Sequence, residues 1–154
     1  MLRLGLVVLL LLVTSGAVYA SAGRSSRPAP VRHTCGLTDR QFLANYQVQL
    51  TAVGMYGDDY LKGSAKAQDV IGAARDAARA VRSSAPFDPA LLTVRHFAPA
   101  MFLEFGRAVK ARAGGKNPAP AMYRSYSLGA RVNEVLREAQ PSLAAAGCDV
   151  TDLL

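Results

Sequence analysis

The sequence predicts an all-α protein: an up-down bundle of four helices whose N- and C-terminal ends are joined by one disulfide. Apolar residues recur at three- and four-residue spacing in four separate stretches, and no stretch has the alternation of a half-buried strand. The two cysteines, Cys35 and Cys148, flank the first and the last of these stretches. An even number of antiparallel helices brings both cysteines to one end of the bundle, where a disulfide can span the ~5.5 Å between Cα atoms that it requires.

Residues 1–22 are predicted to be a signal peptide. Arg3 is followed by an apolar run over residues 4–13 and by the small-residue triplet 20–22, Ala-Ser-Ala, which is the pattern that a signal peptidase cleaves. The apolar run is shorter than the ~20 residues of a membrane-spanning helix. Retention as an anchor is the alternative, and no transmembrane helix is expected in the mature chain. The protein is therefore expected to be secreted or extracytoplasmic, where its two cysteines become oxidised.

Residues 23–34 are predicted to form a flexible basic tail, and residues 35–154 a single helical domain. The tail contains Arg24 and Arg27, has no apolar periodicity, and is expected to leave His33 in solvent. The whole chain has a formal net charge of +7, and its excess of Arg, Ala, Gly and Val indicates a high-GC bacterium. Outside a cell, such a basic surface either meets anionic lipids and phosphate-bearing polymers or only keeps the protein soluble.

The first helix is predicted to start at Thr38, with Gln41 completing a capping box, and to stop at Gly63. Gly54 and Gly57 lie inside it, where each costs ~1 kcal/mol relative to alanine. They are predicted to allow close packing against the second helix, whose apolar face is mostly alanine; a bend that shapes a pocket is the alternative.

The third helix is predicted to start at Asp88, an N-cap that is followed by a first-turn proline, Pro89. A loop over residues 116–120 leads to the fourth helix. Each of these two helices contains an internal proline, Pro99 in the third and Pro141 in the fourth. Because proline removes a backbone donor, both helices are predicted to be kinked or broken there.

Two groups of side chains are candidates for binding. The first would hold haem or another apolar ligand between the first and third helices, and consists of Tyr56, Tyr60, His96 and Met101. The second would hold an anionic envelope or extracellular partner, and consists of Arg107, Lys110, Arg112, Lys116, Tyr123 and Tyr126. For both groups an ordinary core or solvated role is the alternative.

No pattern in the sequence indicates catalysis. There is no G-x-S-x-G, phosphate-binding loop, dinucleotide fingerprint, HExxH or nucleic-acid module. Asp58, Asp59 and Glu104 lack metal-site spacing, so no metal and no cofactor is expected, with haem as the alternative. The expected function is a non-catalytic secreted or envelope binding protein. A carrier of haem or another apolar ligand is the alternative, and a small secreted hydrolase is a third.

The layout of the chain resembles small secreted helical proteins of actinobacteria, including the haem-binding haemophores. The shared features are an export signal, a helical domain, and an early and a late cysteine, here Cys35 and Cys148. The resemblance covers this general plan and no specific motif. It implies haem carriage as the alternative to partner binding, and it assigns neither a family nor a haem ligand to a position of this chain.

Overall fold

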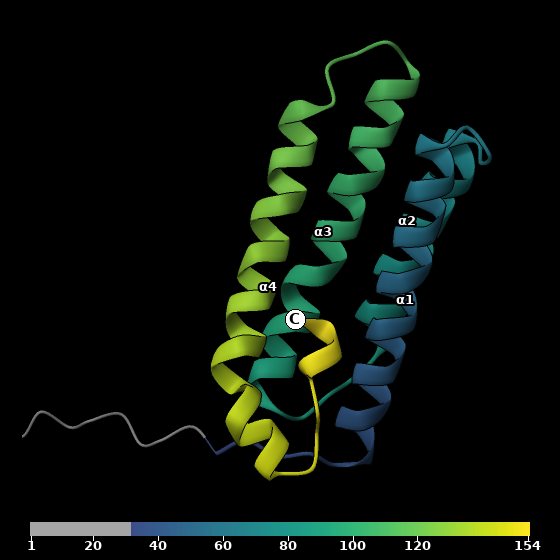
Figure 1. Cartoon of the computed structure of the whole chain (residues 1–154). Helices are drawn as coiled ribbons and strands as arrows, with labels where there is room; N and C mark the ends of the chain where they lie inside the picture. The colour runs from purple at the N-terminus through teal and green to yellow at the C-terminus, as the bar shows by residue number, and fades with distance from the viewer. Residues whose placement is uncertain (1–31) are drawn as a thin grey trace, which may run out of the picture. The chain divides into compact units, whose positions relative to one another are not determined.

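Four helices in up-down order make up the described part of the chain (Figure 1). The structure is a computed structural model that describes residues 32–154; the predicted signal peptide and most of the predicted tail lie outside the described residues. The helices are α1 (Leu37–Leu61), α2 (Ala67–Ser83), α3 (Pro89–Ala113) and α4 (Ala119–Ala145), followed by a 3-10 turn, η1 (Thr151–Leu153). Residues 32–154 contain no strand, and none of their helices is long and apolar enough to cross a membrane. The predicted all-α bundle is confirmed.

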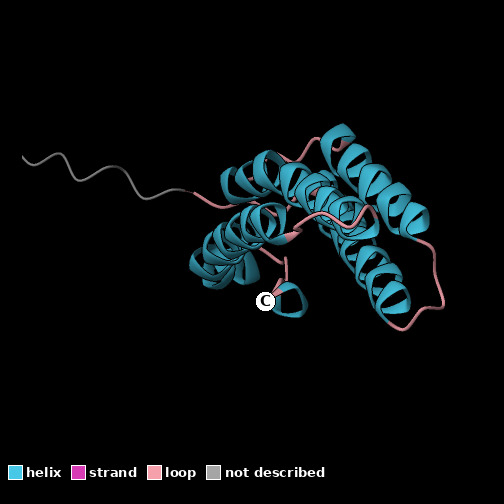
Figure 2. Cartoon of the chain, turned by 90° about the horizontal axis from the view of Figure 1, so that it is seen from above, coloured by secondary structure: helices cyan, strands magenta, loops and turns pink. Residues whose placement is uncertain are grey.

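The four helices pack against one another unequally. α3 lies against α2 and α4 over most of its length and α1 packs mainly on α2, whereas α1 and α4 make no extensive contact within residues 32–154 (Figures 1 and 2). The rings of Phe42 and Phe102 lie 6.2 Å and 6.3 Å from the ring of Tyr46 in the shared core. Burial raises the pKa of Tyr46 to about 12, so its phenol stays protonated and the side chain packs as an uncharged core residue.

α2 presents a face of small residues to α3. Ala74, Ala77 and Ala78 are buried, and a Cβ built on Gly106 of α3 would lie 3.3 Å from the Cβ of Ala74. The close approach predicted for the alanine face therefore occurs. Its partner, however, is α3 at Gly106 and not the glycine pair of α1.

Both internal prolines lie inside continuous helices. α3 runs through Pro99 and α4 runs through Pro141, so of the two predicted outcomes a break does not occur. Proline removes one helical hydrogen bond and crowds the preceding turn, but packing on both sides of each proline holds the helix. The buried residues that flank the two prolines are Ala98, Phe102, Ala139 and Leu143.

The disulfide between Cys35 and Cys148 forms as predicted, with the two Cα atoms 5.6 Å apart. Cys35 precedes α1 and Cys148 follows α4, so the bond closes the chain at the end of the bundle where α1 begins and α4 ends. Disulfides persist in oxidising compartments, and this bond fits an extracytoplasmic protein.

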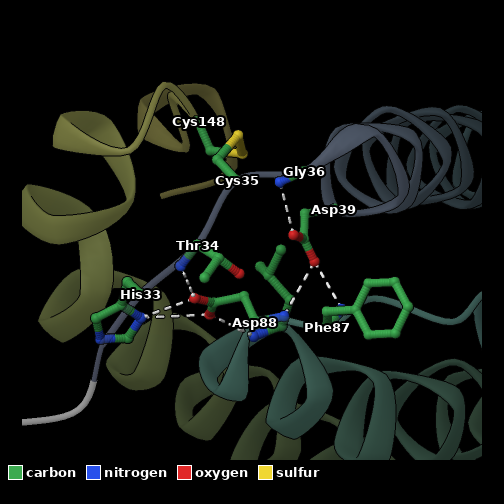
Figure 3. Close-up of a disulfide and its surroundings, with 9 residues drawn as sticks. His33, Thr34, Cys35, Gly36, Asp39, Phe87, Asp88 and Cys148 are labelled. Carbon is green, nitrogen blue, oxygen red and sulfur yellow. Dashed lines mark hydrogen bonds and ion pairs between the residues drawn. A yellow bond between two sulfur atoms is a disulfide. The ribbon is translucent and has the colours of Figure 1, made fainter.

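A buried carboxylate, Asp39, joins the start of α1 to the connection between α2 and α3 beside this disulfide (Figure 3). Its Oδ1 accepts from the backbone N–H groups of Phe87 (2.7 Å) and Asp88 (3.0 Å), and its Oδ2 accepts from that of Gly36 (2.9 Å). The N-cap of α1 is Gly36. The predicted cap at Thr38 is therefore wrong, because Asp39 supplies a charged acceptor that the local sequence pattern did not single out.

The two carboxylate oxygens of Asp88 accept hydrogen bonds from two different segments, the first turn of α3 and the chain just before α1. Its Oδ1 accepts from the backbone N–H groups of Ala90 (2.8 Å) and Leu91 (3.3 Å), which confirms the predicted N-cap of α3. Its Oδ2 accepts from the N–H of Thr34 (2.9 Å) and lies 3.0 Å from Nδ1 of His33 (Figure 3). The His33 side chain is 14% exposed, so the prediction that it lies in solvent is wrong. Its partner is distant in sequence, on the α2–α3 connection.

Candidate functional site

The C-terminal segment, residues 148–154, fills one end of the gap between α1 and α4. Leu153 is buried in the common core, and Nε2 of Gln140 on α4 donates to Oγ1 of Thr151 (3.2 Å). On its other side the segment shares a hollow with Leu43 and neighbouring residues of α1. Figure 1 shows the segment in yellow between α4 and α1. The gap is therefore closed at the disulfide end.

Beyond this segment the gap between α1 and α4 stays open. The first hollow has a volume of ≈ 310 Å³ and is bounded by the C-terminal parts of α1 and α3 and by the start of α4. Its polar side chains are Asp58, Tyr60 and Arg112. The rest of its lining is apolar or glycine: Gly54, Gly57, Leu61, Phe105, Ala108, Val109, Pro118 and Met122.

A second hollow follows one side of α4. It has a volume of ≈ 980 Å³, and no residue of α1 lines it. Its lining consists of Met101 of α3 and of α4 residues that include Met122, Tyr126 and Gly129. Nearer the C-terminal end of α4 the lining is polar: Asn133, Glu134, Arg137 and Glu138. Met122 lines both hollows, so they are adjacent; together they are called the α1–α4 groove. Both volumes lie in the range of about 300–1,000 Å³ that small-ligand pockets occupy.

Three glycines line the groove, two at close contacts with α3 and one at open space. A Cβ built on Gly57 would lie 3.1 Å from Cζ of Phe105, and one on Gly129 would lie 3.2 Å from Sδ of Met101. These two positions therefore let side chains of α3 approach the backbones of α1 and α4. A Cβ on Gly54 would have no atom within 4 Å, so Gly54 faces open space. The two glycines of α1 thus line the first hollow, and α1 runs continuously through both of them.

Gly54→Ala is expected to stabilise the protein by about 1 kcal/mol, because alanine is the better helix former and its methyl group enters open space. Gly57→Ala is the matched control: the same helical gain is offset there, since the methyl group must displace the ring of Phe105. The free energy of unfolding from urea titration measures both changes. Equal gains at the two positions would contradict the packing of Phe105 on Gly57.

The opposite side of the α3–α4 pair is covered by polar side chains. Arg131 lies over the ring of Phe97, 5.0 Å from its centroid, and Glu104 pairs with Arg107 and with Nε of Arg124 (3.0 Å). The groove side carries exposed apolar and aromatic side chains, Leu61, Met122, Tyr123 and Tyr126, and polar ones only toward the C-terminal part of α4: Asn133, Glu134, Arg137 and Glu138. Because contiguous exposed apolar surface marks interaction sites, the groove side is the candidate functional surface.

The structure separates the four residues predicted to bind haem or another apolar ligand. Tyr60 lines the first hollow and Met101 the second. His96 lines a different hollow together with Pro99, because the step of five positions from His96 to Met101 turns α3 by about 140°. Tyr56 is 45% exposed and lies about 200° around α1 from Gly54. Two members of the predicted group, Tyr60 and Met101, belong to the groove.

The group predicted to bind an anionic partner is also divided. Arg112 lines the first hollow, and Tyr123 and Tyr126 line the second. Arg107 and Lys110 border another hollow, between α2 and α3. Lys116 is exposed in the connection between α3 and α4. The groove thus combines members of the two predicted groups, and an anionic macromolecular partner stays a prediction.

The three carboxylates considered as a metal site lie in different surroundings. Glu104 is mostly buried and paired with two arginines, and Asp58 lines the first hollow. The backbone carbonyl of Asp59 accepts from the N–H groups of Ser64 (2.8 Å) and Ala65 (3.2 Å). Among residues 32–154, no three His, Cys, Asp or Glu side chains lie close enough to hold a metal ion.

Sequence reasoning did not single out Met122 and Gly129 as groove residues. Gly129 carries a signal that could have been used, because an interior helix glycine costs ~1 kcal/mol and invites an explanation by close packing. Met122 carries no comparable signal. Its role follows only from the place where α4 starts beside α1 and α3.

The chain matches no protein-family model, no curated protein and no solved structure. The chemistry of the groove's lining therefore indicates which molecules it can bind. The first hollow offers methyl, thioether and aromatic surface with one guanidinium, one carboxylate and one phenol. The second adds Met101, two tyrosines and, toward the C-terminal part of α4, Asn133, Glu134, Arg137 and Glu138. Such a surface can bind an apolar molecule and can orient a charged group of that molecule at the end formed by the first hollow.

Proposed function

We propose that the protein is a non-catalytic binding protein that acts outside the cytoplasm and holds an apolar ligand in the α1–α4 groove. The observation that supports this most directly is the groove itself. Its first hollow is largely apolar and lies between α1, α3 and the start of α4, where α1 and α4 do not pack together, and the second hollow continues from it along α4. In a four-helix bundle the ligand site commonly lies between facing helices.

The disulfide supports the extracytoplasmic part of the proposal. A cross-link between Cys35 and Cys148 persists where thiols are not kept reduced. The predicted signal peptide over residues 1–22 leads to the same compartment. An exported carrier or receptor of an apolar molecule has to shield that molecule from water, and the groove provides surface for this task.

The proposal is tested by filling the first hollow. Gly54→Phe places a ring in the open space beside α1 and is expected to lower the retention of bound lipid at least tenfold. The wild-type protein is exported, purified without reductant and incubated with a total lipid extract of a bacterial envelope. Native mass spectrometry then measures the mass of the protein with any bound lipid. We expect a bound mass on the wild type and on Gly54→Ala, and its loss on Gly54→Phe.

Circular dichroism and the intact mass of the disulfide-bonded chain show whether Gly54→Phe folds; Gly54→Leu, which adds less bulk, is measured beside it. A wild-type protein that stays free of bound mass in saturating extract would contradict the proposed function. So would a bound mass that folded Gly54→Phe retains in full, because the ligand would then lie outside the groove.

A further inference from the structure

We propose that the ligand of the groove is an anionic single-chain amphiphile, with its acyl chain along α3 and α4 and its carboxylate or phosphate head group on Arg112. This inference rests on the proposed function and adds the ligand's chemical class and orientation. It follows from three features of the groove: an unpaired cation at one end, a positive surrounding charge, and a linear apolar floor.

Two arginines line the groove, Arg112 in the first hollow and Arg137 in the second. Glu134 and Glu138 line the second hollow together with Arg137, so the net charge there is negative, and Arg112 is the cation better placed for an anion. It lies in the last turn of α3 and lines the first hollow beside Pro118, the N-cap of α4. Among the ion pairs of residues 32–154 none involves Arg112, whereas Arg107 and Arg124 both pair with Glu104. A guanidinium binds a carboxylate or phosphate through two parallel hydrogen bonds.

The charge around this end of the groove is positive. Asp58 lines the same hollow, and Asp59 follows it. A third carboxylate, Asp69, lies in the first turn of α2 at the same end. These three carboxylates are outnumbered by the five exposed cations of the same helix ends and connections: Lys62, Lys66, Lys110, Arg112 and Lys116. The N-terminus of α4 lies at this end together with the C-termini of α1 and α3, so the helix dipoles add no net positive charge there and the excess comes from the side chains. An anionic head group is therefore favoured at this end over a neutral or cationic one.

The floor of the groove is linear and, between Arg112 and Met101, largely apolar, whereas Asn133, Glu134, Arg137 and Glu138 line the far part of the second hollow. Met101, Phe105, Ala108 and Arg112 recur on one side of α3, and Met122, Tyr126 and Gly129 recur on the facing side of α4. From Arg112 to Met101 the floor extends about 16 Å at 1.5 Å per residue. Methionine side chains adapt to a flexible hydrocarbon chain because they are unbranched and polarisable. The long axis of the two adjacent hollows therefore fits a chain better than a compact ring system.

The test compares head groups on one chain length. Palmitate, hexadecyl phosphate, hexadecanol and hexadecyltrimethylammonium are titrated against the disulfide-bonded protein by displacement of Nile red. We expect palmitate or hexadecyl phosphate to bind about tenfold more tightly than hexadecanol, and the cationic probe to bind most weakly. The order of the two anionic probes distinguishes a carboxylate ligand from a phosphate ligand.

Arg112→Gln is expected to lower the affinity for the better anionic probe about tenfold and to leave that for hexadecanol unchanged. Arg107→Gln is the matched control, since Arg107 pairs with Glu104 and does not line the groove; it should change neither. Arg112→Lys should retain part of the preference. Circular dichroism verifies that each variant is folded.

Equal binding of all four probes, or an affinity for palmitate and hexadecyl phosphate that Arg112→Gln leaves unchanged, would overturn the assignment of the head group and leave the proposed function standing. Binding of none of the four by folded wild-type protein would overturn the amphiphile itself. The lipid-extract experiment with Gly54→Phe then decides separately whether the groove binds anything.

Discussion

Replacing both cysteines, Cys35 and Cys148, with serine is expected to lower the free energy of unfolding by about 4–5 kcal/mol. The disulfide joins residues 113 positions apart, and closing so long a loop removes much of the freedom of the unfolded chain. Loss of the bond also frees residues 148–154, whose position between α1 and α4 is fixed at one side by Cys148. Urea titration of the double variant measures the change.

The wild-type protein after reduction and alkylation is the control for the serine substitutions, and it should show the same loss. Since domains of this size are commonly stable by only about 5–15 kcal/mol, either form should unfold at clearly lower temperature. A loss below about 1 kcal/mol in both forms would show that the C-terminal segment is held by packing alone, with Gln140 and Leu153 as its main contacts.

Asp39→Ala is expected to destabilise the protein by about 3–5 kcal/mol. Three backbone N–H groups, those of Gly36, Phe87 and Asp88, donate to the Asp39 carboxylate, and the alanine variant leaves them without this acceptor. Hydrogen bonds to a charged group and buried donors left unpaired are each worth more than an ordinary surface contact. Urea titration at neutral pH measures the loss, and Asp76→Ala, whose partner Arg79 is exposed, is the control.

The same carboxylate predicts a loss of stability in acid. Burial acts to raise the pKa of Asp39, but the backbone hydrogen bonds from Asp88, Gly36 and Phe87 outweigh it and lower the pKa below the ordinary value of 3.8. The folded state therefore holds its proton less tightly than the unfolded state does. The stabilisation is complete above about pH 5, begins to fall as the unfolded chain takes up the proton near its ordinary pKa, and is lost as the pH falls through the lowered pKa of the folded state. Asp39→Asn should flatten this part of the pH profile; an unchanged profile would contradict the role of the carboxylate.

The features of the fold that could be predicted are those with local signals. Apolar spacing identified four helices, and Asp88 followed by proline identified the start of α3. The positions of Cys35 and Cys148 outside the first and last helices predicted their pairing, because an even helix count brings them together. In each case the information lies within a few residues or in a simple count.

The features that could not be predicted depend on partners far away in the chain. Asp39 finds Phe87 at a separation of 48 residues, and His33 finds Asp88 at a separation of 55. Nothing in the stretch around Asp39 distinguishes a buried acceptor from a solvated first-turn carboxylate. From the local sequence, Pro99 and Pro141 likewise predict helix breaks. The helices stay continuous there because buried residues pack on both sides of each proline.

The candidate site was predicted in pieces that belonged to two different hypotheses. Tyr60 and Met101 came from the proposed small-ligand group, and Arg112, Tyr123 and Tyr126 from the proposed partner group. Helical periodicity identifies the apolar side of each helix but not which of those sides a neighbour leaves uncovered. That depends on where residues 148–154 lie, and their short sequence has no periodicity from which to place them.

The C-terminal segment also gives the groove a fixed stop. It is tethered by the disulfide on one side and by the contact between Gln140 and Thr151 on the other, so it cannot slide along the helices. An occupant anchored at Arg112 would extend toward a barrier whose position is the same in every molecule. The groove would then discriminate between ligands by the length of their acyl chain. Chains that end before the barrier lie wholly in the groove, and longer chains must bend out into water at a cost of ~0.8 kcal/mol for each methylene exposed.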